Sequence, residues 1–135
     1  MARDAPDGVL IIEIGITLGQ EVVPPSSLTQ KAVLALDRLT TSSATYGTVV
    51  SYTVPASKVA ELSGLELMAS NYTLAQFRVT IAGEVKFTDK YLQAPFNPVF
   101  PDVNLKAGDV VLIEAKSDGA TSITVDGAID GKEIS

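Results

Sequence analysis

The stretch that decides the fold is residues 48–67, TVVSYTVPASKVAELSGLEL. In its first part Val50, Tyr52 and Val54 occupy alternate positions, and side chains two residues apart share one face of a strand. Pro55 then ends this pattern, because proline has no N–H to donate to a neighbouring strand. We therefore predict two strands joined by a short loop, and we interpret the pair as a hairpin.

The same two-residue period recurs along the chain, and almost no segment has a helical period. Further strands are predicted in residues 10–18, 76–81, 85–87, 110–115 and 123–129. Short strands spaced about 8 to 12 residues apart, with turn signals between them, are typical of a β-sandwich or barrel. The sequence therefore predicts an all-β chain of about eight strands, in which the apolar residues 110–115 form a central strand.

Two kinds of irregularity are expected inside this pattern. The inward phase changes at Ser63-Gly64, which predicts a β-bulge, and Gly127 suggests a second one. Tight turns are predicted at residues 82–84 and, as an Asp-Gly hairpin turn, at residues 116–120. Residues 131–135 are expected to leave the sheet as a polar end.

Two segments fit the strand pattern less well. Residues 28–39 contain a helical stripe of apolar residues but also read as a strand that is apolar on both sides, and we favour the strand because strands surround it. Residues 92–105 hold three prolines among apolar side chains. We expect this segment to lie extended across an edge or an open end, with both of its Phe rings buried.

The N-terminal residues 1–27 are expected to form an extended arm with a proline-rich hinge, ahead of a domain at residues 28–135. The arm holds an alternating aliphatic strand and two adjacent prolines that disfavour a sheet interior. The equal alternative is that the segment is an ordinary first strand in a sheet of its own chain. The predicted partner-binding residues of the arm are Leu10, Ile12, Ile14, Ile16, Leu18, Pro24 and Pro25.

Composition narrows the possible partners. Charged residues make up 19% of the 135 residues, against about a quarter in a usual soluble domain, so we expect a partner subunit to cover part of the apolar surface. The formal net charge of −6 disfavours a nucleic-acid partner. No apolar run approaches the roughly 18 residues needed to cross a bilayer, and the N-terminus does not resemble a signal peptide, so we expect a soluble protein with no membrane partner.

The residue types that commonly carry catalysis are missing. The chain contains no His and no Cys, which excludes a Ser-His-Asp triad, thiolate chemistry and the usual zinc sites. The acidic residues stand mostly at expected turns, and Asp126 and Asp130 lack the spacing of a calcium loop. We therefore predict no catalytic residue, no metal site and no cofactor, and a protein that is not an enzyme.

A ligand groove is a weaker possibility. Tyr91, Phe96 and Phe100 stand near prolines and could line a groove for a carbohydrate or a peptide. Aromatic residues in such a setting more often pack into a core or its rim.

Three motifs give the chain a family resemblance. Residues 52–58 (YTVPASK, with Ser57 where glycine is usual), 78–83 (RVTIAG) and 105–115 (LKAGDVVLIEA) resemble the small jelly-roll decoration or cement proteins of tailed-phage capsids and related head-fibre modules. The resemblance covers residues 45–134. It implies a single jelly-roll-like antiparallel β-sandwich with an N-terminal arm.

The resemblance also implies a function. Such proteins are non-enzymatic parts of the virion surface, are commonly homotrimers, and bind the major capsid protein to stabilise the shell. The expected location is accordingly the virion surface, after synthesis in the host cytoplasm. The alternative is a receptor- or carbohydrate-binding module of a phage fibre or of a bacterial surface protein.

Overall fold

The computed structural model is a two-layer β-sandwich, and it describes residues 29–135 apart from the side chain of Asp102. The predicted arm residues Leu10 to Pro25 lie outside this range. Eight strands follow one another: β2 (Gln30–Thr41), β3 (Gly47–Thr53), β4 (Val59–Ala69), β5 (Gln76–Ile81), β6 (Glu84–Lys90), β7 (Val99–Leu105), β8 (Val110–Lys116) and β9 (Ile123–Ile134). No helix long and apolar enough to cross a membrane occurs among residues 29–135.

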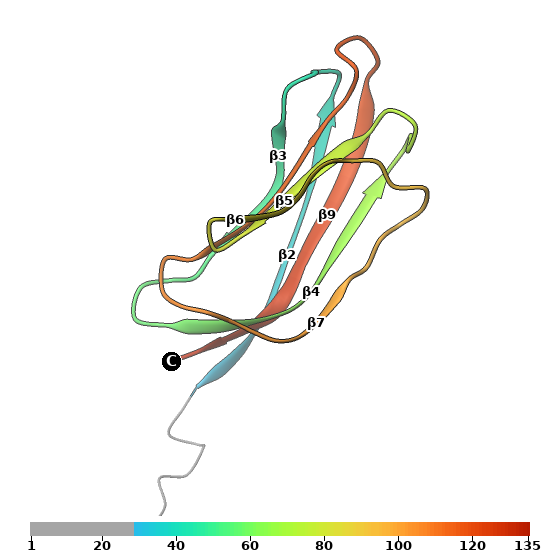
Figure 1. The fold of residues 1–135 in the computed structure, drawn as a ribbon. Coiled ribbons are helices and arrows are strands. Elements are labelled where there is room, and N and C mark those ends of the chain that lie inside the picture. The colour runs from blue at the N-terminus through green and yellow to red at the C-terminus, as the bar shows by residue number, and fades with distance from the viewer. Residues whose placement is uncertain (1–28) are drawn as a thin grey trace, which may run out of the picture.

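The strands form two antiparallel four-stranded sheets, in the orders β2-β9-β4-β7 and β3-β8-β5-β6. Figure 1 shows them as two layers, with the long strands β2, β9 and β4 side by side in one of them. Successive strands mostly alternate between the sheets, as in the eight-stranded jelly roll. The predicted all-β, jelly-roll-like fold is confirmed.

The interpretation of residues 48–67 as a hairpin is wrong. Strand β3 pairs with β8, and β4 pairs with β9 and β7, so the Pro55 loop carries the chain from one sheet to the other. The Asp-Gly turn at residues 116–120 likewise joins β8 to β9 across the sandwich. Strand spacing does not distinguish a hairpin from a crossover, because both need only a short turn.

The hairpin predicted at residues 82–84 is present. Strands β5 and β6 pair directly, and the two turn residues Ala82 and Gly83 have φ angles of 54° and 82°. Positive φ at both central residues is the conformation of the two-residue turn that matches strand twist.

The core lies between the layers and is made by alternate residues of each strand. Phe77, Leu67 and Ile113 are its largest fully buried side chains. Strand β8 lies inside its sheet, as residues 110–115 predicted, and its inward residues Val111, Ile113 and Ala115 have no exposed surface.

Glycines mark two places where a neighbouring residue leaves no room for a side chain. The register of β4 shifts between Leu62 and Gly64, as the predicted bulge requires, and a Cβ on Gly64 would lie 3.0 Å from the carbonyl oxygen of Pro98. Gly127 is not a bulge. It stays in regular register, and a Cβ there would lie 3.0 Å from the side chains of both Val49 and Val50.

The two uncertain segments supply the two edge strands of one sheet. Residues 28–39 fall largely in β2, an edge strand whose outward residues Leu34 and Leu36 are exposed, so its apolar residues on both sides do not reflect burial on both sides. The proline-rich segment forms β7 at the opposite edge of the same sheet. An edge strand has a neighbour on one side only, so it tolerates the missing N–H of Pro101. Phe100 packs against the core, but Phe96 is 39% exposed, so the expectation that both rings are buried is wrong for Phe96.

The chain end is more ordered than expected. Strand β9 continues to Ile134, and Glu133 is buried rather than part of a polar end. Backbone hydrogen bonds of 3.1 and 2.9 Å join Thr29 and Ser135 in both directions. The start of β2 and the C-terminus therefore lie together at one end of the sandwich (Figure 1).

Candidate interaction surface

The strongest candidate for a functional surface is the outer face of the β2-β9-β4-β7 sheet. On β2 the odd-numbered residues Val33, Ala35 and Leu39 turn inward and are half-buried. Leu34 and Leu36 turn outward and are 65% and 66% exposed. Single exposed aliphatic residues are common on protein surfaces. Two on the same face of a strand are informative when neighbouring strands add further apolar residues and make a continuous patch.

Cross-strand neighbours extend this apolar surface over the sheet. Leu34 is in register with Asp130, which pairs with Gly64, and Gly64 pairs with Val99 of β7. Val99 is 82% exposed. One row further along β2, Leu36 is in register with Ala128, which pairs with Glu66. Larger side chains at the margins and small residues in the middle leave the centre of this face hollow.

Two open hollows occupy that centre and share Glu66 and Ala128. The first, of about 330 Å³, also includes Leu36 and Met68, and the second extends past Gly64 to Leu34 and Val99. Because they share lining residues, we treat them as one depression and call it the outer trough. The outer trough is defined by Leu34, Leu36, Glu66, Met68, Val99 and Ala128.

The charges around the outer trough are mainly negative. The residues that line its two hollows include the acidic Asp37, Glu66, Asp126 and Asp130 and the basic Arg38. Arg38 donates to both carboxylate oxygens of Asp126, at 2.6 and 3.0 Å, and thereby lowers the pKa of Asp126. Asp126 is thus neutralised by Arg38, and the Asp37 carboxylate accepts from the backbone N–H of Arg38. Glu66 and Asp130 therefore form the acidic rim around an apolar floor.

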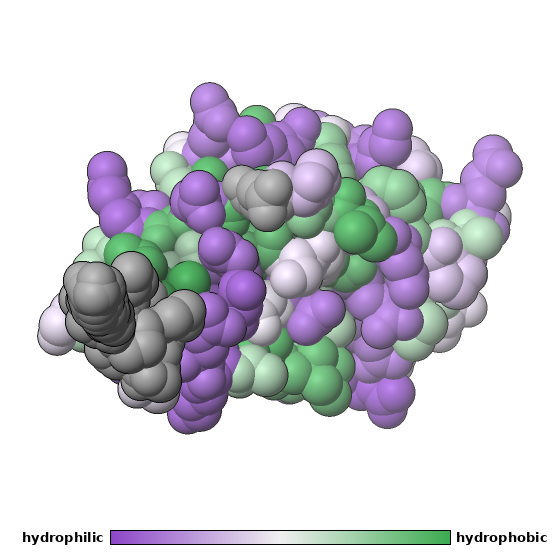
Figure 2. Space-filling view, turned by 90° about the horizontal axis from the view of Figure 1, so that it is seen from below, coloured by the Kyte–Doolittle hydropathy of each residue, from purple (hydrophilic) through white to green (hydrophobic). Residues whose placement is uncertain are grey.

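A view of the lower end of the molecule shows how mixed the surface is. In Figure 2 hydrophilic side chains project around the margin, and hydrophobic residues reach the surface between them. Val59, which lines a separate hollow with Ile134, is 48% exposed. Apolar exposure is thus spread over several places, and the outer trough is the hollow that combines three exposed aliphatic residues, Leu34, Leu36 and Val99.

The other sheet carries a polar cluster around Tyr46. The guanidinium of Arg78 lies 4.2 Å from the Tyr46 ring centre, and Lys116 lies 4.6 Å from it. The Tyr46 hydroxyl donates to Asp89 at 2.7 Å, Lys116 pairs with Asp89 at 2.9 Å, and Arg78 pairs with Glu114 at 2.7 Å. The hydrogen bond from Lys116 is the main cause of the lowered pKa of Asp89.

This cluster has a structural explanation. Its members come from β5, β6, β8 and the segment before β3, and each charged group already has a partner inside the cluster. Such mutual pairing ties the strands together, as structural ion-pair networks do. Among residues 29–135, moreover, no group of three or more acidic side chains is arranged to hold a metal ion.

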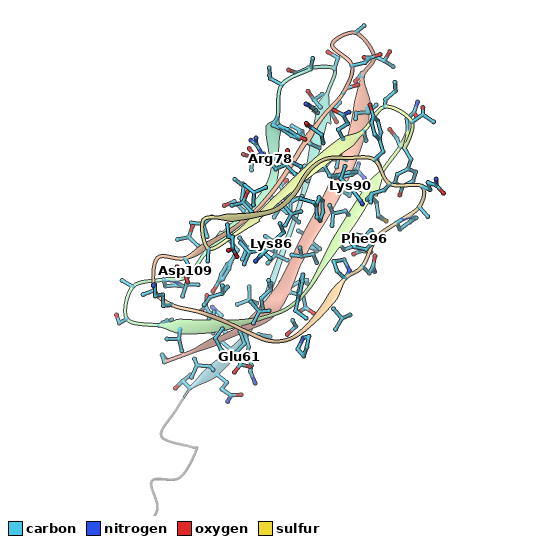
Figure 3. The ribbon with its side chains drawn as sticks, viewed as in Figure 1. Glu61, Arg78, Lys86, Lys90, Phe96 and Asp109 are labelled. Atoms are coloured by element: carbon cyan, nitrogen blue, oxygen red, sulfur yellow. The ribbon has the colours of Figure 1, made fainter. Side chains whose placement is uncertain are left out.

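The three aromatic residues predicted as a possible groove lie in different settings. Tyr91 is 54% exposed and lines an open hollow with Tyr72, Thr73, Leu92 and Gln93. Phe96 packs edge-to-face on Phe87, with ring centres 6.4 Å apart, and Phe100 packs against the core. Figure 3 shows Phe96 on the side of β7 and Arg78 on the side of β3.

The outer trough was missed by reasoning from the sequence. Its signal was present, because residues 28–39 read as apolar on both sides. The Tyr46 cluster had no local signal, since Tyr46 and Asp89 are 43 residues apart in the chain.

Comparison with known proteins adds little to this description. No protein-family model matches the chain, and no curated protein matches it. Among solved structures, it is similar to the CBM36-1 domain of a multidomain xylanase from the hindgut metagenome of Trinervitermes trinervoides, at 20% identity and a TM-score of 0.36. The similarity covers 78% of this chain and 97% of that domain.

Proposed function

We propose that this chain is a non-enzymatic structural protein that attaches to a larger protein assembly through the outer trough. The observation that carries the proposal is the coincidence of exposed Leu34, Leu36 and Val99 with a hollow on one sheet face. A hollow with an apolar floor and an acidic rim is suited to a protruding apolar side chain of the partner that is flanked by Lys or Arg. The paired charges around Tyr46 support a role without catalysis.

The assembly that we propose is a tailed-phage capsid, with the chain acting as a decoration or cement protein on the major capsid protein. Support for this identity comes from the motifs at residues 52–58, 78–83 and 105–115, and the jelly-roll topology is compatible with it. A fold alone does not specify a partner, so the outer trough supplies the residues for a test.

The test compares two matched substitutions at exposed valines. Val99→Asp places a charge in the outer trough, whereas Val85→Asp places the same charge on β6, where Val85 is 53% exposed. Capsids prepared without this protein are mixed with each full-length variant and sedimented. We expect wild type and Val85→Asp to sediment with the capsids and Val99→Asp to stay in solution. If all three stay in solution, attachment to capsids is wrong; if all three sediment, the outer trough is not the attachment surface.

A second candidate function rests on the hollow at Tyr72 and Tyr91. Two tyrosines beside Thr73 and Gln93 combine aromatic faces with hydrogen-bonding groups, as carbohydrate sites require. A glycan array separates the candidates. Binding that is lost in Tyr91→Ala but kept in Val99→Asp would favour the carbohydrate-binding module, and the absence of any bound glycan on the array would count against it.

A further inference from the structure

Each sheet has two edge strands, and β2 differs from the other three. It pairs with β9 over twelve consecutive residues without a register shift and contains no proline. Register shifts interrupt the pairing of β3, of β6 and of β7, and β7 also contains Pro101. Bulges and prolines protect an edge against further pairing, whereas a long regular edge is open to it.

The structure shows which backbone groups of β2 face the free edge. Thr29 and Ser135 exchange two hydrogen bonds, so they form a hydrogen-bonded pair of the antiparallel ladder. Bonded and non-bonded pairs alternate along such a ladder, so the odd-numbered residues of β2 bond to β9. The N–H and C=O groups of Gln30, Ala32, Leu34, Leu36, Arg38 and Thr40 therefore point away from β9.

The free edge is limited by its own side chains. The backbone N–H of Arg38 donates to the Asp37 carboxylate at 2.8 Å, so this donor is already satisfied. A charged residue at this position on an edge strand also discourages pairing beyond it. Lys31 limits the edge at its other end in the same way, so the open stretch runs from Ala32 to Leu36, and no strand among residues 29–135 pairs with β2 on that side.

We propose that this open edge accepts the Leu10–Leu18 segment of a second copy of the chain as an added strand. The segment has the alternating pattern of a strand, and its five aliphatic even-numbered residues suit the half-buried side of β2 at Val33 and Ala35. Its remaining residues, such as Glu13 and Thr17, would lie on the outer face. Addition of a strand from another chain to a free edge is a known mode of recognition.

The length of the connecting chain permits this exchange. Residues 19–29 can span at most roughly 35–40 Å when extended, which is enough to leave one subunit and reach another. Pro24 and Pro25 favour an extended conformation over the reversal needed to return to the same β2. Exchange of identical segments between subunits is a low-cost route to homo-oligomers. The low content of charged residues, 19%, agrees with apolar surface that a second subunit covers.

The test uses prolines as a backbone probe in the full chain, with the mass measured by light scattering. Leu34→Pro removes an N–H that faces the free edge without removing a bond to β9, whereas Leu34→Ser changes the side chain and keeps the N–H. Ile14→Pro makes the matching change in the segment and leaves residues 29–135 intact. Circular dichroism and the urea midpoint report whether each variant stays folded.

We expect wild type and Leu34→Ser to have a multiple of the 14.1 kDa chain mass, and Leu34→Pro and Ile14→Pro to have 14.1 kDa. A wild-type mass of 14.1 kDa would overturn the exchange.

Two results in the variants would also contradict the proposal. An oligomer in either proline variant would show that the segment and the edge do not form the contact. A monomer in Leu34→Ser would show that the Leu34 side chain, and not the backbone edge, makes the contact. Should Leu34→Pro unfold, Ile14→Pro alone decides. Particle binding by Val99→Asp reports on the outer trough separately, because Val99 is on the opposite edge strand.

Discussion

At the scale of single residues, the lower end of the sandwich is closed by a contact between the two sheets. The Tyr52 hydroxyl of β3 donates to Glu133 of β9 at 2.7 Å, and the Lys58 ammonium lies 3.4 Å from the same carboxylate. The hydrogen bond from Tyr52 is the main cause of the lowered pKa of Glu133, and Lys58 lowers it further. A carboxylate with a lowered pKa stabilises the folded state while it is ionised.

We expect Tyr52→Phe to lower the free energy of unfolding at neutral pH and to reduce its dependence on acid pH. Stability from Glu133 is present above the ordinary carboxyl pKa of 4.5 and is lost as the pH falls through the lower folded value. Urea unfolding of wild type and variant between pH 7 and pH 3 measures this. Equal acid slopes in the two proteins would show that the Tyr52 contact does not lower this pKa.

Ser57 provides a second residue-scale prediction. It stands where the resembling family usually has glycine, and its φ angle is 64°, a conformation that costs little for glycine and more for other residues. We expect Ser57→Gly to raise the free energy of unfolding by roughly 0.5–1 kcal/mol, after the entropy cost of glycine in the unfolded chain is subtracted. The control is Ala56→Gly in the same loop, which should not stabilise the protein. A lower urea midpoint for Ser57→Gly would contradict the strain at this position.

At the scale of elements, the pairing of β4 with β9 depends on a glycine opposite its bulge. Gly131 pairs with Leu62, and a Cβ on Gly131 would overlap the carbonyl oxygen of Glu61. The obstacle is backbone, which cannot move without changing the pairing. At Gly127 the obstacles are the valine side chains at 3.0 Å, which can shift slightly.

We therefore expect Gly131→Ala to destabilise the protein more than Gly127→Ala. Overpacking against side chains costs typically about 1–3 kcal/mol, and a clash with backbone should exceed that range. Thermal or urea unfolding of the two variants gives the comparison directly. The explanation would fail if Gly127→Ala proved the more damaging of the two.

The sequence predicted elements better than their connections. Alternating residues identified β5, β8 and the strands around Pro55 because each pattern is local. Whether the chain after Val54 returns to the same sheet depends on pairing with β7 and β9, which lie far along the chain, so a local pattern could not exclude the hairpin. The bulge at Gly64 could be predicted because it changes the local phase, whereas Gly127 serves the packing of Val49 and Val50 and leaves the phase intact.

At the scale of the whole molecule, the fold separates two kinds of surface. One sheet carries the mutually paired charges around Tyr46, and the other carries the outer trough with its acidic rim. The sequence showed only the part of the outer trough that lies on β2, as apolar residues on both sides of residues 28–39, because the rows of the trough combine residues from β2, β9, β4 and β7. The low content of charged residues did predict exposed apolar surface, which Leu34, Leu36 and Val99 provide, and the partner subunit that would cover it stays a prediction.

The measurement that tests this account most directly is cryo-electron microscopy of the tailed-phage particles to which we propose that the protein attaches. We predict density for the sandwich on the outside of the shell, with the outer trough facing the capsid subunits and the Tyr46 cluster facing away. Density in which the β3-β8-β5-β6 sheet faces the shell, or purified particles from which mass spectrometry shows the protein to be absent, would contradict it.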